Sequence, residues 1–457
     1  MKIGYFGIAL CATALSATIA NAQDINAYKL LNLSLEDPTL GSARYAGMGG
    51  AMGAIGGVSS ALKDNAASIA AGTKSDIGLT FDLYSNNDGQ CSFAVSDASL
   101  LFNIDHNNNS GYMSSALAIT YNRNRTFDSD IYLKDKTFIS TTNDHEEGGT
   151  DAINFAYAGN INNQFYFGVA VGITDLRFEK SNVYKDPYLT DDLISNTDGT
   201  GCNFNVGLLY QPTDFMRVGV GIQTPTLYNI DESWSLVENG VEIFDWLLEY
   251  SYKIHTPMKF SAQLGFMVGD RANIGIDYSM RNYTRMWGEY SNLKMRHLEE
   301  DIKEICKTQH TLKVGAEVNV VGGLDLRAGY AICTAPVLEA KEACDKLASL
   351  GGAYVGDYWY ADDYDNDGNP IGEEYYHGPL YSFTSPKLRQ YISAGFGYSG
   401  RVAYVDFAYI RKIATVQYMF QQPFDEGKCD FVSTYANELG DQKYGSNHFM
   451  LSFGFHF

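Results

Sequence analysis

The sequence lacks the long apolar runs of a helical membrane protein. After the apolar stretch at residues 3–19, no other run of about twenty apolar residues occurs, so helical membrane spans are excluded. Basic residues are also scarce, with 33 Lys and Arg against 54 Asp and Glu, for a net charge of -21. Nucleic acid is therefore excluded as a partner, because phosphates need a cationic surface.

Catalytic and metal-binding motifs are missing as well. The chain has no G-x-S-x-G, H-E-x-x-H, P-loop or C-x-x-C sequence, and its eight His residues are scattered. We therefore expect no enzymatic activity, and a membrane-embedded hydrolase is disfavoured for want of a Ser/His constellation. His448 and His456 are interpreted as polar residues of a lumen rather than as metal ligands.

The N-terminus has the pattern of a secretory signal peptide. Lys2 supplies the positive charge, residues 3–19 supply the apolar segment, and Ala20-Asn21-Ala22 is an A-x-A cleavage site. We expect residues 1–22 to be removed, so that the mature chain starts near Gln23 in the cell envelope.

The abundant residues favour a membrane barrel. The chain contains 33 Tyr, 25 Phe and 45 Gly, yet its mean hydropathy is only -0.20, because alternation hides a lipid-facing surface from averages. The last ten residues alternate strictly, and the apolar set ends on a terminal aromatic: Phe449, Leu451, Phe453, Phe455 and Phe457. This is typical of the closing strand of an outer-membrane barrel; the alternative is a half-buried strand of a soluble sandwich.

Period-two segments predict fourteen strands. Their starts lie near Ile77, Ser92, Tyr112, Ala152, Gln164, Cys202, Phe215, Met258, Ala272, His310, Leu324, Tyr391, Val402 and Asn447. Short turns alternate with long connectors, as short periplasmic turns alternate with long external loops in such barrels. The predicted fold is an all-β, 14-stranded antiparallel transmembrane β-barrel over residues 76–457, whose largest external loop spans about 336–388. A strand-like piece at residues 249–254 is expected to extend the eighth strand above the membrane.

Residues 23–75 precede the first strand and are predicted to form a hatch, or plug, inside the lumen. Residues 41–57 are too rich in Gly and Ala to build a core of their own, but small residues pack tightly against a wall. Inward-facing glycines of the strands would leave room for them. The alternative is a loose periplasmic arm.

Two hatch motifs resemble those of the FadL-like outer-membrane transport family, most closely its Bacteroidetes branch. The first, G-S-A-R-Y-A-G-M-G-G-A, contains Gly47, Gly49 and Gly50, and the second, D-N-A-A-S-I-A-A-G, contains Asn65, Ala66 and Ala67. The family usually has Asn-Pro-Ala in the second motif, so this chain departs from it there.

The resemblance implies passive uptake of hydrophobic solutes across the outer membrane of a Gram-negative bacterium, with exit through a gap at a kinked third strand. Here the third strand is residues 112–124, which show no local sign of a kink. We expect Arg44, Tyr45, Met48 and Met52 to line a ligand pocket; the alternative is that they merely pack.

One external segment matches the calcium-loop pattern D-x-[DN]-x-[DN]-G-x5-E. Its candidate ligands are Asp363, Asp365, Asp367, Asn369 and Glu374. Calcium in this loop is therefore the one cofactor we expect; the alternative is a solvated acidic loop tip.

Six cysteines follow the signal peptide, all at the expected outer rim, which is an oxidising location. Cys333 and Cys344 are the closest pair in sequence and a candidate disulfide.

Two functions fit these patterns. The first is a channel for hydrophobic small molecules such as fatty acids, with the solute and membrane lipid as partners. The alternative is a plugged barrel that serves as a binding or structural subunit of an outer-membrane secretion or surface-assembly complex.

Overall fold

The structure is a computed structural model. It describes residues 27–421 and 441–457, apart from residues 73, 87–88, 90, 106–111, 135–140, 186–189, 270, 291–292, 340–341, 344–345, 347–358, 361–362, 365–369, 372–374 and 377–380. The predicted signal peptide lies outside this part of the chain.

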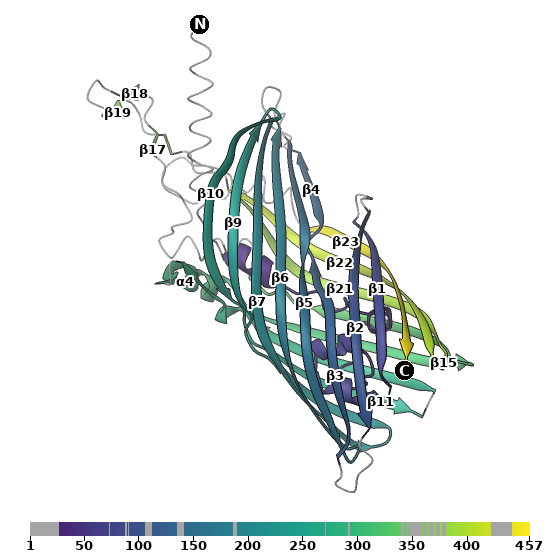
Figure 1. The fold of residues 1–457 in the computed structure, drawn as a ribbon. Helices are drawn as coiled ribbons and strands as arrows, with labels where there is room; N and C mark the ends of the chain where they lie inside the picture. Colours follow the sequence, from purple (N-terminus) through teal and green to yellow (C-terminus); the bar gives the residue numbers. More distant parts are fainter. Residues whose placement is uncertain are drawn as a thin grey trace.

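Fourteen antiparallel strands form a closed barrel wall (Figure 1), as predicted. Each strand pairs with the next along the wall, and the first pairs with the last from Asp76–His456 to Asn86–Ser446. In chain order the wall strands are β1 (Asp76–Asn86), β2 (Cys91–Asp105), β3 (Tyr112–Thr126), β5 (Thr141–Ile161), β6 (Phe165–Lys185), β7 (Thr190–Thr213), β8 (Met216–Gln223), β11 (Lys259–Val268), β12 (Ala272–Asn282), β15 (Thr308–Val321), β16 (Leu324–Cys333), β21 (Tyr381–Ser399), β22 (Ala403–Gln421) and β23 (Asp441–His456).

Alternating side chains give the wall an apolar outside and a polar inside. On β6, Phe165, Val169 and Ile173 are about half exposed, whereas Gly168 and Ala170 between them are buried. Charged lumen residues such as Lys313 and Glu317 are buried. No helix among the described residues is long and apolar enough to cross a membrane.

Part of the sheet continues above the apolar belt. β5, β6 and β7 have 21, 21 and 24 residues, and beyond the belt their outward positions become polar, for example Asp175 and Asp198. The other strands of this extension, and the short strands beside it, are β4 (Ser129–Lys134), β9 (Leu227–Glu238), β10 (Val241–His255), β13 (Trp287–Tyr290) and β14 (Leu293–Lys294). Four two-residue strands lie apart from the wall: β17 (Trp359–Tyr360), β18 (Asp363–Tyr364), β19 (Pro370–Ile371) and β20 (Tyr375–Tyr376).

Two wall strands reach the extension through breaks that contain proline. Pro225 lies in the break between β8 and β9, and Pro257 lies in the break between β10 and β11. The ladder is interrupted at these positions because proline has no N–H to donate. At this level the backbones of Thr226 and Thr256 are joined, with the Thr256 N–H donating to the Thr226 carbonyl at 3.1 Å. β10 pairs with β9 as β11 pairs with β8, so residues 249–254 extend the eighth wall strand, as predicted.

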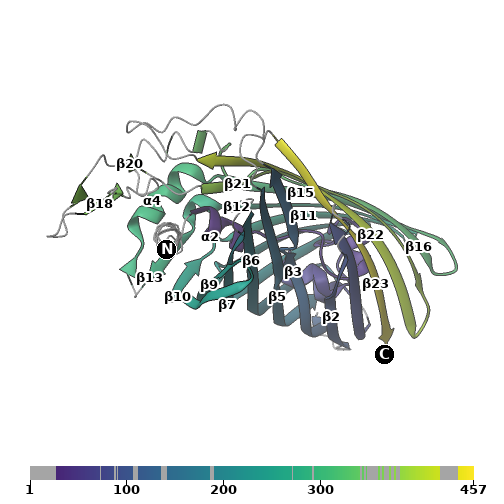
Figure 2. The ribbon, with the colours of Figure 1, turned by 90° about the horizontal axis from the view of Figure 1, so that it is seen from above.

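The N-terminal segment lies inside the barrel (purple in Figure 1). We call its described part, residues 27–72, the hatch; its elements are α2 (Ala27–Ser34), α3 (Ala43–Gly47) and the 3-10 helices η1 (Ser59–Lys63) and η2 (Ala66–Ala71). The remaining helices, η3 (Tyr283–Arg285) and α4 (Arg296–Ile305), lie between β12 and β15. α2 lies beside α4 at the external end (Figure 2), where the two helices share an apolar core with the inner face of the extension.

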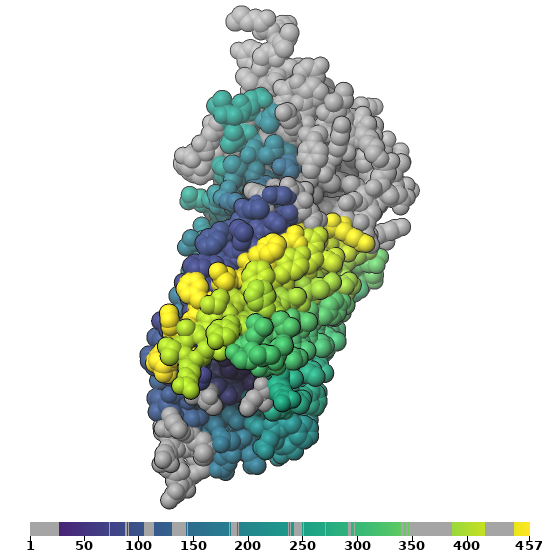
Figure 3. Space-filling model, turned by 90° about the vertical axis from the view of Figure 1, so that its right-hand side faces the viewer, coloured from purple at the N-terminus to yellow at the C-terminus, as the bar shows by residue number. Residues whose placement is uncertain are grey.

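The hatch also fills the opposite end of the lumen. η2 packs against small residues of β3, β5 and β6, while α3 packs against β16, β21 and β22. Figure 3 shows purple hatch atoms in the hollow between the lower ends of the strands. The hatch therefore spans the lumen from the external end to the start of β1.

Candidate functional site: ion pairs between hatch and wall

The two sequence motifs form the compact turns of the hatch. Ser42 caps α3 by accepting a hydrogen bond from the Tyr45 N–H at 3.4 Å, and Asn65 caps η2 by accepting from the Ala67 N–H at 3.0 Å. Gly49 and Gly50 have φ values of 61° and 76°, which favour glycine. The Asn65 amide also donates to the Leu208 carbonyl at 3.1 Å, so the second motif is attached to β7.

Wall glycines let the hatch backbone touch the sheet. A Cβ at Gly168 would lie 2.3 Å from the Ala66 carbonyl, and one at Gly315 would lie 2.1 Å from the Met48 carbonyl oxygen. Real Cβ atoms do not approach backbone so closely, so any side chain at these positions would displace the hatch.

Asp64 is the centre of the contacts between the hatch and β15. Lys313 Nζ donates to its Oδ2 at 2.6 Å, and the Tyr45 hydroxyl donates to the same oxygen at 2.6 Å. The two charged side chains are 2% and 6% exposed. Lys259 of β11 approaches the other oxygen of Asp64 at 3.6 Å.

Glu36 and Asp37 attach the hatch to other strands. Glu36 accepts from Arg281 of β12 at 2.6 Å. Asp37 pairs with Lys412 of β22 at 3.0 Å and with Arg389 of β21 at 3.3 Å, and it also accepts from the Tyr391 hydroxyl. Three hatch carboxylates are thus held by cations on strands of one continuous part of the wall, from β11 to β22.

The surrounding charges shift the pKa values of these hatch groups. Burial alone would raise the pKa of Asp37, but Lys412 and Arg389 hold it well below its usual range. Burial would likewise raise the pKa of Asp64, but Lys313 and Lys259 hold it well below its usual range. Burial lowers the pKa of the Lys63 ammonium to about 8, although Asp64 opposes this shift.

A second set of ion pairs lies beside α3. Arg44 binds both carboxylate oxygens of Glu317 at 2.7 and 2.8 Å, and Arg327 donates to Glu317 at 2.6 Å and also to Asp406. Removing one partner of such a buried pair leaves an uncompensated charge, so the pairs oppose movement of the hatch.

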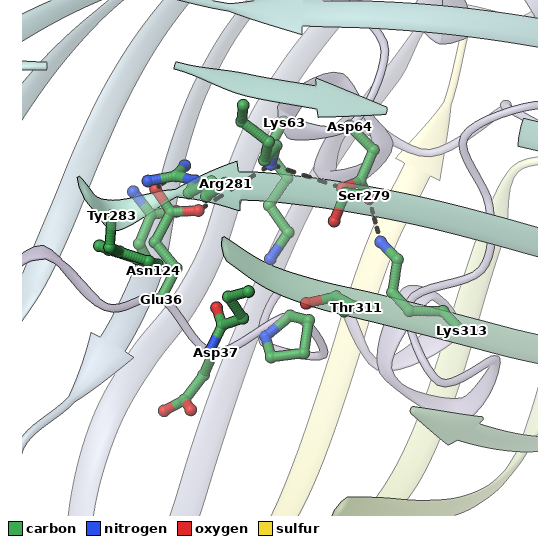
Figure 4. A pocket seen from close by; sticks show the side chains of 13 residues that line it. Glu36, Asp37, Lys63, Asp64, Asn124, Ser279, Arg281, Tyr283, Thr311 and Lys313 are labelled. Carbon is green, nitrogen blue, oxygen red and sulfur yellow. Dashed lines mark hydrogen bonds and ion pairs between the residues drawn. The ribbon is translucent and has the colours of Figure 1, made fainter. Parts of the chain in front are cut away.

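A small polar cavity of about 40 Å³ lies where the hatch meets β11, β12 and β15 (Figure 4). Since one buried water needs about 10–15 Å³ of such volume, the cavity has room for about three waters. Its charged lining consists of Glu36, Asp37, Lys63, Asp64, Lys259, Arg281 and Lys313. Such a cavity suits water or a small ion and is too small and too polar for a hydrophobic solute.

The four predicted ligand-lining residues come together in the hatch but do not line this cavity. Tyr45, Met48 and Met52 are fully buried in one apolar cluster, and Arg44 is held by Glu317. Their role in binding a ligand stays a prediction. The sequence reasoning missed Glu36, Asp37 and their strand partners, since no motif marks them.

The metal and disulfide predictions fall largely outside the described residues. Asp365, Asp367, Asn369 and Glu374 are not described, nor is the side chain of Asp363, so the calcium site stays a prediction. Elsewhere in the described chain no group of three or more His, Cys, Asp or Glu residues is arranged to hold a metal. Cys333 is buried, and Cys344 lies outside the described residues, so their pairing also stays a prediction.

The wall strands β2 and β3 are incompletely paired with each other. β3 pairs with β2 over Asp97–Asn122 to Asp105–Ser114, but residues 91–96 of β2 and 123–126 of β3 do not pair with each other. We call this the β2–β3 gap. On the lumen side the Tyr84 hydroxyl of β1 reaches beyond it and donates to Asp128 at 2.7 Å.

Comparison with solved structures shows the fold. The chain resembles a FadL homologue from Pseudomonas aeruginosa (15% identity, 92% of this chain and 99% of that chain covered, TM-score 0.55). It also resembles the toluene transporter TbuX of Ralstonia pickettii (12% identity, 93% and 100% covered, TM-score 0.54) and the monoaromatic hydrocarbon channel CymD (14% identity, 93% and 98% covered, TM-score 0.52).

A family model matches part of the sequence. Residues 145–287 match the family described as type IX secretion system membrane protein PorP/SprF. No curated protein matches the chain. The chain thus has the fold of these FadL-like barrels.

Proposed function

We propose that this plugged barrel acts as a binding or structural subunit of a type IX secretion complex. The observation that carries the proposal is the fixed hatch: Asp37 and Asp64 form buried ion pairs with wall strands, and Glu36 forms a partly buried one. A solute could pass only if these pairs broke together, and each would leave a buried charge uncompensated. A bore closed in this way favours a scaffold over a conduit.

The family match supports the same role. It covers residues 145–287, which include most of β5, all of β6 to β12 and the extension strands β9 and β10. The inner face of the extension is supported by α2 and α4, so the extension is a firm surface above the membrane. We infer that partner subunits bind its outer, polar face.

Copurification tests this proposal. Affinity-tagged protein, extracted from membranes in mild detergent, is expected to carry other envelope proteins at fixed stoichiometry. Asp198 and Asp231 lie opposite each other on exposed positions of β7 and β9, so the double variant Asp198→Lys, Asp231→Lys should lose those partners. The matched control Asp214→Lys, in a turn at the other end of β7, should keep them. Recovery of the unmodified protein as a lone barrel would contradict the proposal.

The β2–β3 gap favours a second candidate, the uptake of hydrophobic solutes with lateral exit. Unpaired backbone beside the exposed, apolar Phe93 would let a solute step from the lumen into lipid. The solved structures of similar fold include a toluene transporter and a hydrocarbon channel. Proteoliposomes containing the protein should then take up labelled toluene faster than empty vesicles. Bridging the gap with a cross-linked Val95→Cys, Arg123→Cys pair should abolish the difference, and equal rates from the start would exclude this candidate.

A further inference from the structure

The cavity contains an ammonium group, that of Lys259, for which the described residues provide no acceptor within hydrogen-bond distance. The two carboxylate oxygens within 4 Å of Lys259 Nζ are at 3.6 Å in Asp64 and at 3.9 Å in Glu36, both beyond hydrogen-bond distance. Each of these carboxylates is already bound at 2.6 Å by another cation, Lys313 or Arg281. The Lys259 side chain is only 9% exposed, so bulk water does not solvate it fully.

A second ammonium group lines the same cavity under similar conditions. Lys63 donates to the Leu40 carbonyl and lies 4.8 Å from the centre of the Tyr45 ring, and no described carboxylate lies within 4 Å of it. Its lowered pKa reflects burial and the repulsion of Lys313 and Lys259. Four cations line the cavity against three carboxylates, and Asp37 among those carboxylates is already shared by Lys412 and Arg389.

This arrangement meets the needs of a small anion. Burying an ammonium group whose three donors are not all accepted is costly, and an anion near both lysines provides further acceptors and reduces their repulsion. The volume of about 40 Å³ leaves room for a small ion together with some water.

We propose that this cavity binds one small monovalent anion of halide size, held by Lys259 and Lys63, and that the bound anion strengthens the attachment of the hatch to the wall. The site is internal and does not depend on which role the external surface plays.

Bromide is the probe for this site. Crystals of the full-length protein grown in bromide are expected to show an anomalous scattering peak in the cavity, beside Lys259 Nζ. In solution, the temperature of the heat-dependent gel shift should rise by a few degrees and saturate when gluconate is replaced by chloride or bromide at constant ionic strength. Gluconate is too large for the cavity, so it serves as the non-binding anion.

Lys259→Met should remove the difference between halide and gluconate, because it removes the group with the least satisfied charge. The matched control is Lys253→Met on β10, whose partner Glu289 lies outside the cavity, and this variant should keep the full difference. Should Lys259→Met fail to fold, Lys63→Met tests the site from the hatch side.

Two results would overturn the proposal. One is a cavity without an anomalous peak in bromide, which would mean that it holds water only. The other is a gel-shift temperature that responds to halide equally in Lys259→Met and in the unmodified protein, which would place the effect elsewhere.

Discussion

Asp64 of the hatch and Lys313 of β15 form an ion pair of 2.6 Å although 249 positions separate them in the sequence. The pair connects the plug to the wall deep in the lumen, where Tyr45 completes the hydrogen bonding of the carboxylate. The hatch is therefore bonded to the wall and does not only fill the lumen.

Replacing Asp64 should loosen the hatch. Asp64→Asn leaves the buried Lys313 with only the more distant carboxylate of Asp277, at 4.0 Å, and breaking a buried pair of this kind costs about 3–5 kcal/mol. The free energy of hatch opening, measured by amide hydrogen exchange over residues 45–65, should fall by that amount. In the control Asp175→Asn, which removes an exposed pair with Arg177, the change should be about 0–1 kcal/mol. Equal exchange in both variants would show that the buried pair does not hold the hatch.

Acid should release the hatch only below the ordinary carboxyl range. The pKa values of Glu36, Asp37 and Asp64 are lower in the folded protein than in the unfolded chain. Their contribution to stability is therefore complete above about pH 4, the unfolded value, and is lost as the pH falls through the lower folded pKa values. Amide exchange around Asp37 should stay slow at pH 4, and fast exchange already at pH 5 would contradict this assignment.

A side chain at Gly315 should expel the hatch without preventing barrel formation. In Gly315→Val the new Cβ would lie 2.1 Å from the Met48 carbonyl oxygen, so the hatch backbone must move. We expect a normal heat-dependent gel shift together with rapid proteolysis of the hatch. The neighbouring lipid-facing Val314→Ile should leave the hatch protected, since Val314 points away from it. A protected hatch in Gly315→Val would show that the close contact is dispensable.

A charge on the apolar belt should destabilise the barrel according to its depth. Val169→Arg places a cation in the middle of the lipid-facing stretch of β6, at a cost of about 2–4 kcal/mol. Asp175→Arg, six residues further along on the same outward face and beyond the belt, should cost about 0–1 kcal/mol. Unfolding in lipid vesicles by denaturant measures both, and similar costs would mean that the belt is placed incorrectly.

Removal of divalent metal tests the calcium prediction for the external loop. If Asp363 and Glu374 belong to a calcium site, chelator should speed proteolytic cleavage within residues 336–388, and added calcium should restore protection. Asp367→Asn should raise the calcium concentration that is needed for this protection. Cleavage that ignores both chelator and calcium would leave the loop a solvated acidic tip.

The wall could be predicted from the sequence because its pattern is local. Strict alternation, as in residues 448–457, fixes the face of each side chain within one strand, and all fourteen predicted strands occur. Burial of residues 41–57 could be expected from their small size. The sequence does not predict how far β5, β6 and β7 continue above the membrane. Their outward positions there are polar, as at Asp175 and Asp198, so the segments lack the apolar alternation of a membrane strand.

The ion pairs could not be predicted from one sequence. Asp37 meets Lys412 and Arg389, and Glu36 meets Arg281, across hundreds of positions, and nothing near these residues marks their partners. Arg44 was correctly placed in the hatch, but its side chain is fully engaged with Glu317. Such pairings depend on the registers of several strands at once, which only the closed barrel fixes.

The pairing of β1 with β23 has a consequence for biogenesis. The ring cannot close until the chain has been synthesised through its last strand, whereas the hatch belongs to the part made first. Because residues 27–72 pack against the inner faces of strands all around the wall, we infer that their insertion precedes or accompanies closure. The machinery that assembles this barrel therefore has to keep an almost finished sheet open around its own leading segment.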